Sequence, residues 1–170
     1  MLNFKQFFKE NKNISTISVP IDNVEKPFDI DRNFDIPYFG GISNNNKTIY
    51  IDSSAPCHIK VNGITYNYAR SLAIHEFYEK RKMEQEWLTY NPAHQFATGI
   101  ERKFVENNGV NFDEYSKQLK IWIEIALNKS MDNSSLRIPF DLYMGPYNTD
   151  MIPEKRVLYN KMIKYLVKPI

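Results

Sequence analysis

Cysteine is nearly absent from this sequence, because Cys57 is the only one among its 170 residues. A single cysteine excludes an intrachain disulfide framework and any zinc site built from a cysteine cluster. No apolar run approaches the roughly 20 residues that a membrane-spanning helix needs. The opening residues, MLNFKQFFKENKN, also lack the apolar segment of a signal peptide. These absences predict a soluble cytoplasmic protein that has no membrane partner.

An excess of charge of either sign is also missing. The chain has 22 Lys and Arg residues against 20 Asp and Glu residues, and its longest basic run is the tripeptide at 80–82. Nucleic-acid-binding domains present a clustered basic surface, so we expect no nucleic-acid partner. The sequence contains no glycine-rich phosphate loop, no GxSxG elbow and no Rossmann fingerprint. Nucleotide hydrolases and serine esterases built on those motifs are therefore excluded.

The composition that remains is that of a folded protein. Hydrophobic residues make up 42% of the chain and aromatic residues 14%, enough to build a core in a chain of this length. We expect a single domain over residues 1–170, in three parts. Residues 1–47 form an N-terminal helix and an irregular segment, 48–128 form a core that holds the candidate site, and 129–170 form a covering loop and a C-terminal helix.

Local signals place the elements within this domain. Asn62-Gly63 predicts a β-hairpin, Asn91 followed by Pro92 predicts a helix N-cap and first turn, and Gly109 predicts a left-handed helix end. The expected elements are a short helix carrying Phe4, Phe7 and Phe8, a strand at 48–52, the hairpin, and helices at 68–87, 91–106, 113–128 and 153–167. Because strands precede helices, we predict an α+β fold in which a small antiparallel sheet is followed by a helical bundle.

One stretch, SLAIHEFYEK at 71–80, carries a possible metal motif. It differs from the HExxH string of zinc peptidases by a glutamate in the last position. On a helix His75 and Glu79 project from the same face one turn apart. Glu76 stands where HExxH enzymes place the general base that takes a proton from the metal's water. The string therefore predicts two ligands and a base.

The following helix offers His94 and, two turns later, Glu101. Two ligand sets remain open at this point. His75, Glu79 and His94 would favour Zn²⁺, with Glu101 as a fourth ligand or as a partner of a ligand. His75, Glu79 and Glu101 would shift the preference towards Mn²⁺ or Fe²⁺. A non-enzymatic alternative is that the same side chains form a polar network joining two helices.

Residues 48–125 resemble an uncharacterised family of small phage and bacterial proteins. The shared pattern is Tyr50-Ile51-Asp52, a hairpin, HE-x-x-E, Tyr90 followed by Ala93-His94, then Glu101 and the segment GVNFDEY at 109–115. The pattern is similar to a reduced zincin-like metallopeptidase core. It implies a metal-dependent hydrolase of phage origin with a peptide or protein substrate. Glutamate at position 79 departs from HExxH, which supports metal binding more than proteolysis.

The resemblance also implies a place of action and partners. A phage protein of this kind acts in the host cytoplasm or the virion, and its partner is a virion or host protein. For the hydrolase, Tyr78 and Tyr90 are candidate donors to a substrate oxygen. The strand at 48–52, or an arm of the hairpin, is a candidate to hold an extended peptide by strand addition.

Overall fold

The computed structural model describes residues 14–132, 136–148 and 153–167. Six strands come first: β1 (Ile14–Ile21), β2 (Val24–Asp31), β3 (Gly40–Ile42), β4 (Thr48–Ile51), β5 (Ile59–Val61) and β6 (Ile64–Tyr66). They are followed by α2 (Ala69–Gln85), α3 (Tyr90–Asn107), α4 (Phe112–Asp132), β7 (Ile138–Pro139), α5 (Pro153–Lys164) and β8 (Leu166–Val167). The α+β class is therefore confirmed, with the sheet preceding the helices.

The main sheet has the order β1-β2-β4-β3. Its β1–β2 and β3–β4 pairs are antiparallel, as expected, but β2 and β4 run parallel, so the prediction of a purely antiparallel sheet is wrong. Each antiparallel pair is a local hairpin that a turn signal can reveal. The parallel pair joins two hairpins through the loop at 32–39, and no local sequence signal specifies it.

The expectation of an irregular segment before residue 47 is also wrong, because β1 and β2 are each eight residues long. Pro20 lies in β1, an edge strand of the sheet. Pro27 lies in β2 before Asp29, where the pairing with β4 begins. Proline lacks a backbone N–H and is tolerated where one side of a strand pairs with no other strand. Both positions meet this condition. The expected helix with Phe4, Phe7 and Phe8 lies outside the described residues.

Local signals predicted the structure better from residue 59 onwards. The turn at Asn62-Gly63 joins β5 and β6 with positive φ at both residues, and Gly109 ends α3 at φ +75°. The N-cap of α3 is Thr89 rather than Asn91. Pro92 tolerates this shift because it still lies in the first turn, where backbone N–H groups have no partner within the helix. At the other boundaries α4 continues to Asp132, and α5 ends at Lys164 before β8.

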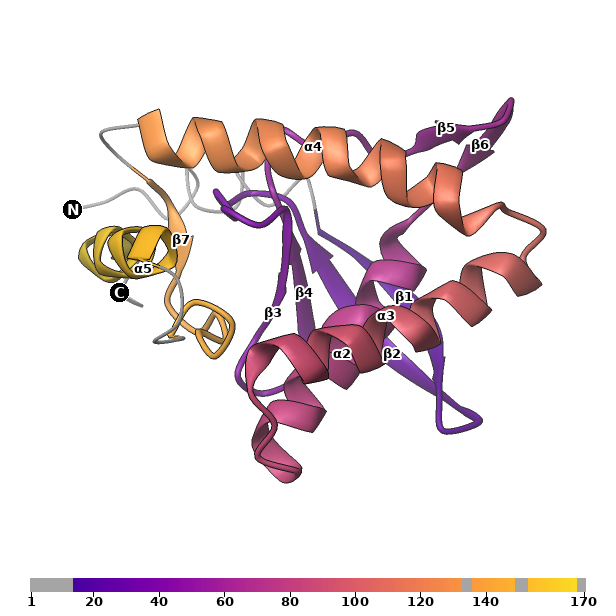
Figure 1. Ribbon diagram of the computed structural model, residues 1–170, viewed down its shortest axis with the longest axis horizontal. Coiled ribbons are helices and arrows are strands. Elements are labelled where there is room, and N and C mark those ends of the chain that lie inside the picture. Colours follow the sequence, from indigo (N-terminus) through magenta and orange to yellow (C-terminus); the bar gives the residue numbers. More distant parts are fainter. Residues whose placement is uncertain (1–13, 133–135, 149–152, 168–170) are drawn as a thin grey trace.

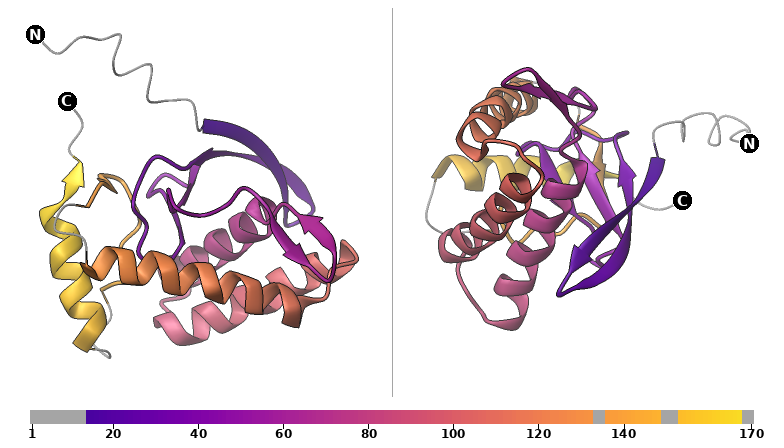
Figure 2. Two further views of the ribbon diagram at one scale, coloured as in Figure 1. Left: turned by 90° about the horizontal axis from the view of Figure 1, so that it is seen from above. Right: turned by 90° about the vertical axis from the view of Figure 1, so that its right-hand side faces the viewer.

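Helix α2 lies between the sheet and α3, as the end-on view in Figure 2 shows, while α4 runs across one end of this stack (Figure 1). The first two turns of α2, from Ala69 to His75, are mostly buried. A second apolar cluster forms where the C-terminal segment, residues 136–148 and α5, packs on Ile36 and Tyr50. Among the described helices, none has the length and apolar character needed to cross a membrane.

Asp52 is a buried anchor between the sheet and α4. Its carboxylate is fully buried, accepts hydrogen bonds from the N–H groups of Ile36 and Ser54, and pairs with Lys129 Nζ at 2.9 Å. Burial opposes the charge on Lys129, but Asp52 and Asp35 outweigh it and raise the pKa of this lysine. The contact therefore ties the C-terminal half of α4 to the end of β4.

Replacing Lys129 with methionine is expected to destabilise the fold by about 2 kcal/mol, because the buried Asp52 carboxylate loses its counter-charge. Urea unfolding would measure the change in the free energy of unfolding. Lys117→Met is the matched control, since Lys117 pairs with Glu114 in open solvent and should leave stability unchanged. Equal stability of the two variants would show that the Asp52 contact does not anchor α4.

Candidate metal centre

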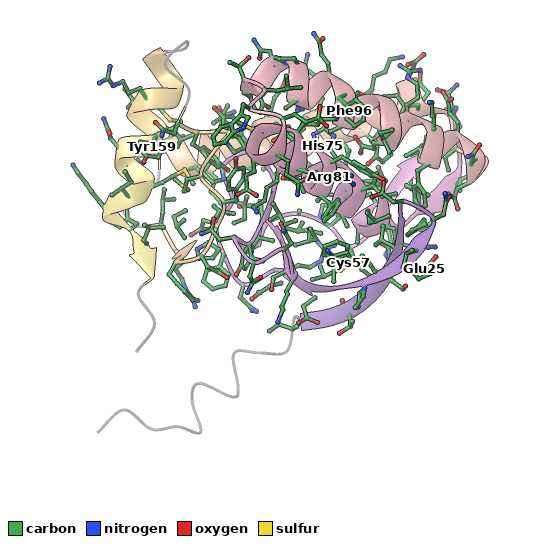
Figure 3. All side chains as sticks on the ribbon, turned by 90° about the horizontal axis from the view of Figure 1, so that it is seen from below. Glu25, Cys57, His75, Arg81, Phe96 and Tyr159 are labelled. Atoms are coloured by element: carbon green, nitrogen blue, oxygen red, sulfur yellow. The ribbon has the colours of Figure 1, made fainter. Side chains whose placement is uncertain are left out.

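The five residues singled out in the sequence line a single cavity of about 380 Å³ between α2, α3, α4 and β3: His75, Glu76, Glu79, His94 and Glu101. His75 and Glu79 lie one turn apart on the side of α2 that faces α3. His75, Glu79 and Glu101 are buried, whereas His94 is partly open. Figure 3 shows His75 within the helical layer, well apart from the exposed Cys57.

Three donor atoms converge in this cavity. Glu79 Oε2 lies 2.7 Å from His94 Nδ1 and 3.3 Å from His75 Nε2, and the two ring nitrogens are 3.1 Å apart. In a tetrahedral zinc site with ligand distances of about 2.0–2.1 Å, two ligand atoms lie about 3.3 Å apart. The separations fit one face of such a tetrahedron. His75, Glu79 and His94, which we call the three-donor group, therefore lie within metal-binding distance of one another.

The antiparallel packing of α2 and α3 decides how His94 and Glu101 are used. Helix α2 ends at Gln85, and a short linker, in which Trp87 has φ +56°, turns the chain back into α3. Glu79, near the end of α2, thus meets His94, near the start of α3. One turn earlier on α2, His75 meets Glu101, which lies two turns further along α3.

Glu101 contacts the edge of the His75 ring opposite the one that faces Glu79 and His94. Its Oε2 lies 2.9 Å from His75 Nδ1, which is a hydrogen bond donated by that nitrogen. This bond leaves Nε2 as the ring nitrogen directed at Glu79 and His94. Glu101 is in the position of a partner that orients a ligand histidine, the lesser of the two roles predicted for it.

Two residues that sequence reasoning missed complete this arrangement. The Tyr115 hydroxyl on α4 donates a hydrogen bond to Glu101 Oε1 at 2.6 Å, and the Ser71 hydroxyl lies 2.9 Å from the Tyr115 oxygen. All of these side chains are buried. Tyr115 belongs to the segment GVNFDEY, so the signal was present in the sequence, but its spacing from Glu101 gives no hint of contact. We call Tyr115, Glu101 and His75 the relay.

The charges of the three-donor group favour a cation. Burial disfavours the ionised form of Glu79, but hydrogen bonds from His75 and His94 overcome this effect and lower the pKa of Glu79 to about 2. Burial likewise opposes the charged form of His75, yet the carboxylates of Glu101 and Glu79 raise the pKa of its imidazole well above the usual value. A metal ion would have to displace the proton from His75 Nε2, so its binding would release a proton.

Glu76 differs from its neighbours because no described protein group donates a hydrogen bond to it. It is half-buried on α2, facing the cavity next to Gly40 of β3. Burial and the negative charge of Glu79 raise the pKa of Glu76 to about 8. A carboxyl group with such a pKa can both give up and take a proton near neutral pH.

Strand β3 packs against α2 and lines the cavity beside it. A methyl group at Gly40 would come within 2.8 Å of Leu72 and 3.1 Å of Glu76, so any larger residue would have to displace these two side chains. Phe39, just before it, is held at φ +76°, a conformation that is strained for a bulky side chain and is found most often near functional sites. The strand therefore passes directly over the glutamate that was predicted to act as a base.

The two tyrosines expected to serve as donors have different positions. Tyr90 lines the cavity and stacks on His94, with ring centroids 5.2 Å apart. The Tyr78 hydroxyl instead donates to Asp22 at 2.9 Å, in an exposed contact between α2 and the β1–β2 turn. Tyr78 is therefore ruled out as a donor in the cavity, because it is not among the residues that line it.

Comparison of the chain with protein-family models, with curated proteins and with solved structures finds no match. The similarity to a reduced zincin-like core therefore stays a prediction from the sequence pattern. What is known of this site comes from the geometry of the chain itself.

Proposed function

We propose that the protein binds one Zn²⁺ ion through His75, Glu79 and His94 and acts as a metal-dependent hydrolase. The observation that carries this proposal is the set of three donor atoms, spaced by 2.7 to 3.3 Å at the wall of a cavity large enough for a substrate. Two imidazoles with one carboxylate favour zinc over Mn²⁺ or Fe²⁺. The hydrogen bond between Glu101 and His75 also supports this ligand set over the one that includes Glu101.

When bound, the ion would polarise a water molecule and a substrate carbonyl. The chain's own contribution is made by Glu76, which accepts the proton from the attacking water and delivers it to the leaving group. Its unpaired carboxylate and its raised pKa suit this exchange near neutral pH. The relay keeps His75 in one tautomer and one orientation, so that its Nε2 remains available.

A peptide is the proposed substrate, because the cavity borders β3 at Gly40, next to the part of its outer edge where the backbone of Asp141 and Tyr143 bonds to Asn44 and Ile42. β3 is an edge strand of the main sheet, whereas β4, one of the two segments predicted to take up a peptide, is enclosed between β2 and β3. The N–H and C=O groups of Gly40 point away from β4, since its neighbours Phe39 and Ser43 make the hydrogen bonds to that strand. An extended peptide could pair there and pass over Glu76. A peptidase of phage origin is also what the resemblance noted in the sequence implies.

The first experiment is elemental analysis of untagged protein purified without a chelator. We expect about one equivalent of zinc, and cleavage of an unstructured protein such as casein that stops on chelation and returns with zinc. A well-folded protein that takes up no zinc, even when zinc is added back, would contradict the proposal. Zinc without cleavage of any peptide in a broad library would leave a metal site but not a peptidase.

Tyr115→Phe is expected to weaken zinc binding about 10- to 100-fold, because it removes the hydroxyl that fixes Glu101 against His75. Competition with a chromophoric chelator would measure the affinity. Tyr78→Phe is the matched control, since it removes a hydroxyl from an exposed contact on the same helix as His75. Equal zinc affinities of the two variants would show that the relay does not orient the ligand.

The rival function is a non-enzymatic phage structural or accessory protein. One observation favours it: the polar groups already satisfy one another, because Glu79 pairs with His94 and Glu101 pairs with His75 and Tyr115. Such a network joins α2, α3 and α4 without any metal. It predicts that Glu79→Gln lowers stability by the same amount with and without zinc, whereas a zinc site predicts a larger loss when zinc is present.

A further inference from the structure

A buried tyrosine in the lining of the cavity has no role in the site described so far. Tyr147 follows β7 in the C-terminal segment, and it is 3% exposed. Its hydroxyl is one of two buried side-chain polar atoms in the described part of the chain that have no hydrogen-bonding partner. The backbone N–H of Tyr38 lies near this oxygen without reaching hydrogen-bonding geometry. Buried polar groups are nearly always paired, so an unpaired one calls for an explanation.

The Tyr147 ring is held firmly in place, so the missing partner is not a consequence of a loose side chain. It stacks on Tyr38 with the ring centroids 5.0 Å apart and the planes 22° apart. Its backbone N–H donates to Met144 O at 3.1 Å, and it packs with Ile36 and Leu142 in the second apolar cluster. A donor that is fixed in advance loses little freedom when an acceptor arrives.

The position of this hydroxyl connects it with the proposed site. Tyr147 lines the same cavity as Glu76 and the three-donor group. Burial, and after it the nearby Glu76 carboxylate, raise the pKa of the Tyr147 hydroxyl well above the usual value, so it remains a protonated donor. The other buried hydroxyl in this cavity, that of Tyr115, is already engaged by Glu101. The second unpaired atom, Ser130 Oγ, does not line the cavity.

We infer that Tyr147 donates a hydrogen bond to an oxygen of the bound ligand, and that the cavity is therefore a site for a carbonyl-containing ligand. The ligand would contact Tyr147, Glu76 and the three-donor group, all of which line the same cavity. An amide has the matching chemistry, because its oxygen accepts from Tyr147 while its N–H donates to Glu76. The inference rests on the proposed function for its setting, and it identifies a contact residue that the sequence pattern did not include.

The test compares Tyr147→Phe with Tyr50→Phe. Each change removes one hydroxyl from a buried ring in the second apolar cluster. The Tyr50 hydroxyl donates to Asp141 at 2.6 Å and lies outside the cavity, so its loss should lower the melting temperature. Tyr147→Phe removes a hydroxyl with no partner and should melt at the same or a higher temperature. Both variants should bind as much zinc as the wild type.

The probe is acetohydroxamate, whose carbonyl oxygen stands in for that of an amide, titrated calorimetrically into the zinc-loaded proteins. We expect at least a 10-fold weaker affinity for Tyr147→Phe and no change for Tyr50→Phe. Unchanged affinity of Tyr147→Phe, or a loss of thermal stability equal to that of Tyr50→Phe, would overturn the inference.

If the wild type takes up no zinc, the proposed function fails, but the contact between Tyr147 and a ligand oxygen can still be tested. The titration is then followed by NMR in the metal-free proteins. Shifts of cavity resonances that are lost in Tyr147→Phe alone would support the contact. Absence of binding to the wild type, or equal binding to both variants, would refute it.

Discussion

Glu76→Gln is expected to stabilise the metal-free protein while abolishing hydrolysis. The two effects have opposite signs because a half-buried carboxylate without a hydrogen-bonding partner costs stability and is also the proposed base. Glutamine has nearly the same shape and remains neutral. Loss of the base should reduce turnover by about 10²- to 10⁴-fold, while the zinc content stays at that of the wild type because Glu76 is not among the proposed ligands.

The pH dependence of this gain follows from the pKa of Glu76, which is raised from 4.5 to about 8 in the folded state. Between those values the folded protein holds a proton that the unfolded chain has lost. The contribution of Glu76 to stability is therefore fully present below about pH 4.5 and is lost as the pH rises towards 8. Relative to the wild type, Glu76→Gln should gain nothing at pH 4 and about 2–4 kcal/mol at pH 8.

Urea unfolding of both proteins in the presence of a chelator, at several pH values, would measure this difference. Glu106→Gln is a suitable control on the neighbouring helix α3, since Glu106 is exposed and its partner Arg102 is exposed as well. A Glu76→Gln variant that turns over peptide at the rate of the wild type would remove Glu76 from the mechanism. A gain in stability that does not grow with pH would mean that Glu76 is ionised throughout.

His94→Gln is expected to lower zinc affinity by more than about 100-fold, which is the upper end of the effect of losing a residue that only orients a ligand. The fold should tolerate the change, because His94 is the most exposed of the three proposed ligands. In the wild type, zinc at 1,000 times its dissociation constant adds about 4 kcal/mol to the free energy of unfolding. His94→Gln should lose most of this increment and keep its stability in the presence of chelator.

Thermal unfolding with zinc and with chelator separates these two contributions. His58→Gln is the matched control, since the third histidine of the chain is exposed and lies outside the cavity. It should show the full zinc increment. An increment in His94→Gln equal to that of the wild type would mean that His94 is not a ligand, and that His75 and Glu79 bind zinc with another partner.

The sequence by itself determined the elements whose signals are local. Asn62-Gly63 specified a hairpin because both turn residues must take positive φ, and Gly109 ended α3 for the same reason. His75 and Glu79 were placed on one face by helical periodicity alone. The α+β class followed from the order of the elements, which needs no knowledge of how they pack.

Tertiary structure decided which of these residues meet. The parallel pairing of β2 with β4 and the prolines inside β1 and β2 depend on which strand edges are occupied, and no window of sequence contains that information. The length of the linker between α2 and α3 brought His94 to Glu79 and Glu101 to the other side of His75. Tyr115 and Tyr147 come from segments that are far from the HExxE string in the chain. They join the cavity only because α4 and the C-terminal segment pack against it. Contacts between distant segments are set by the burial of whole helices and strands, not by the spacing of residues along the chain.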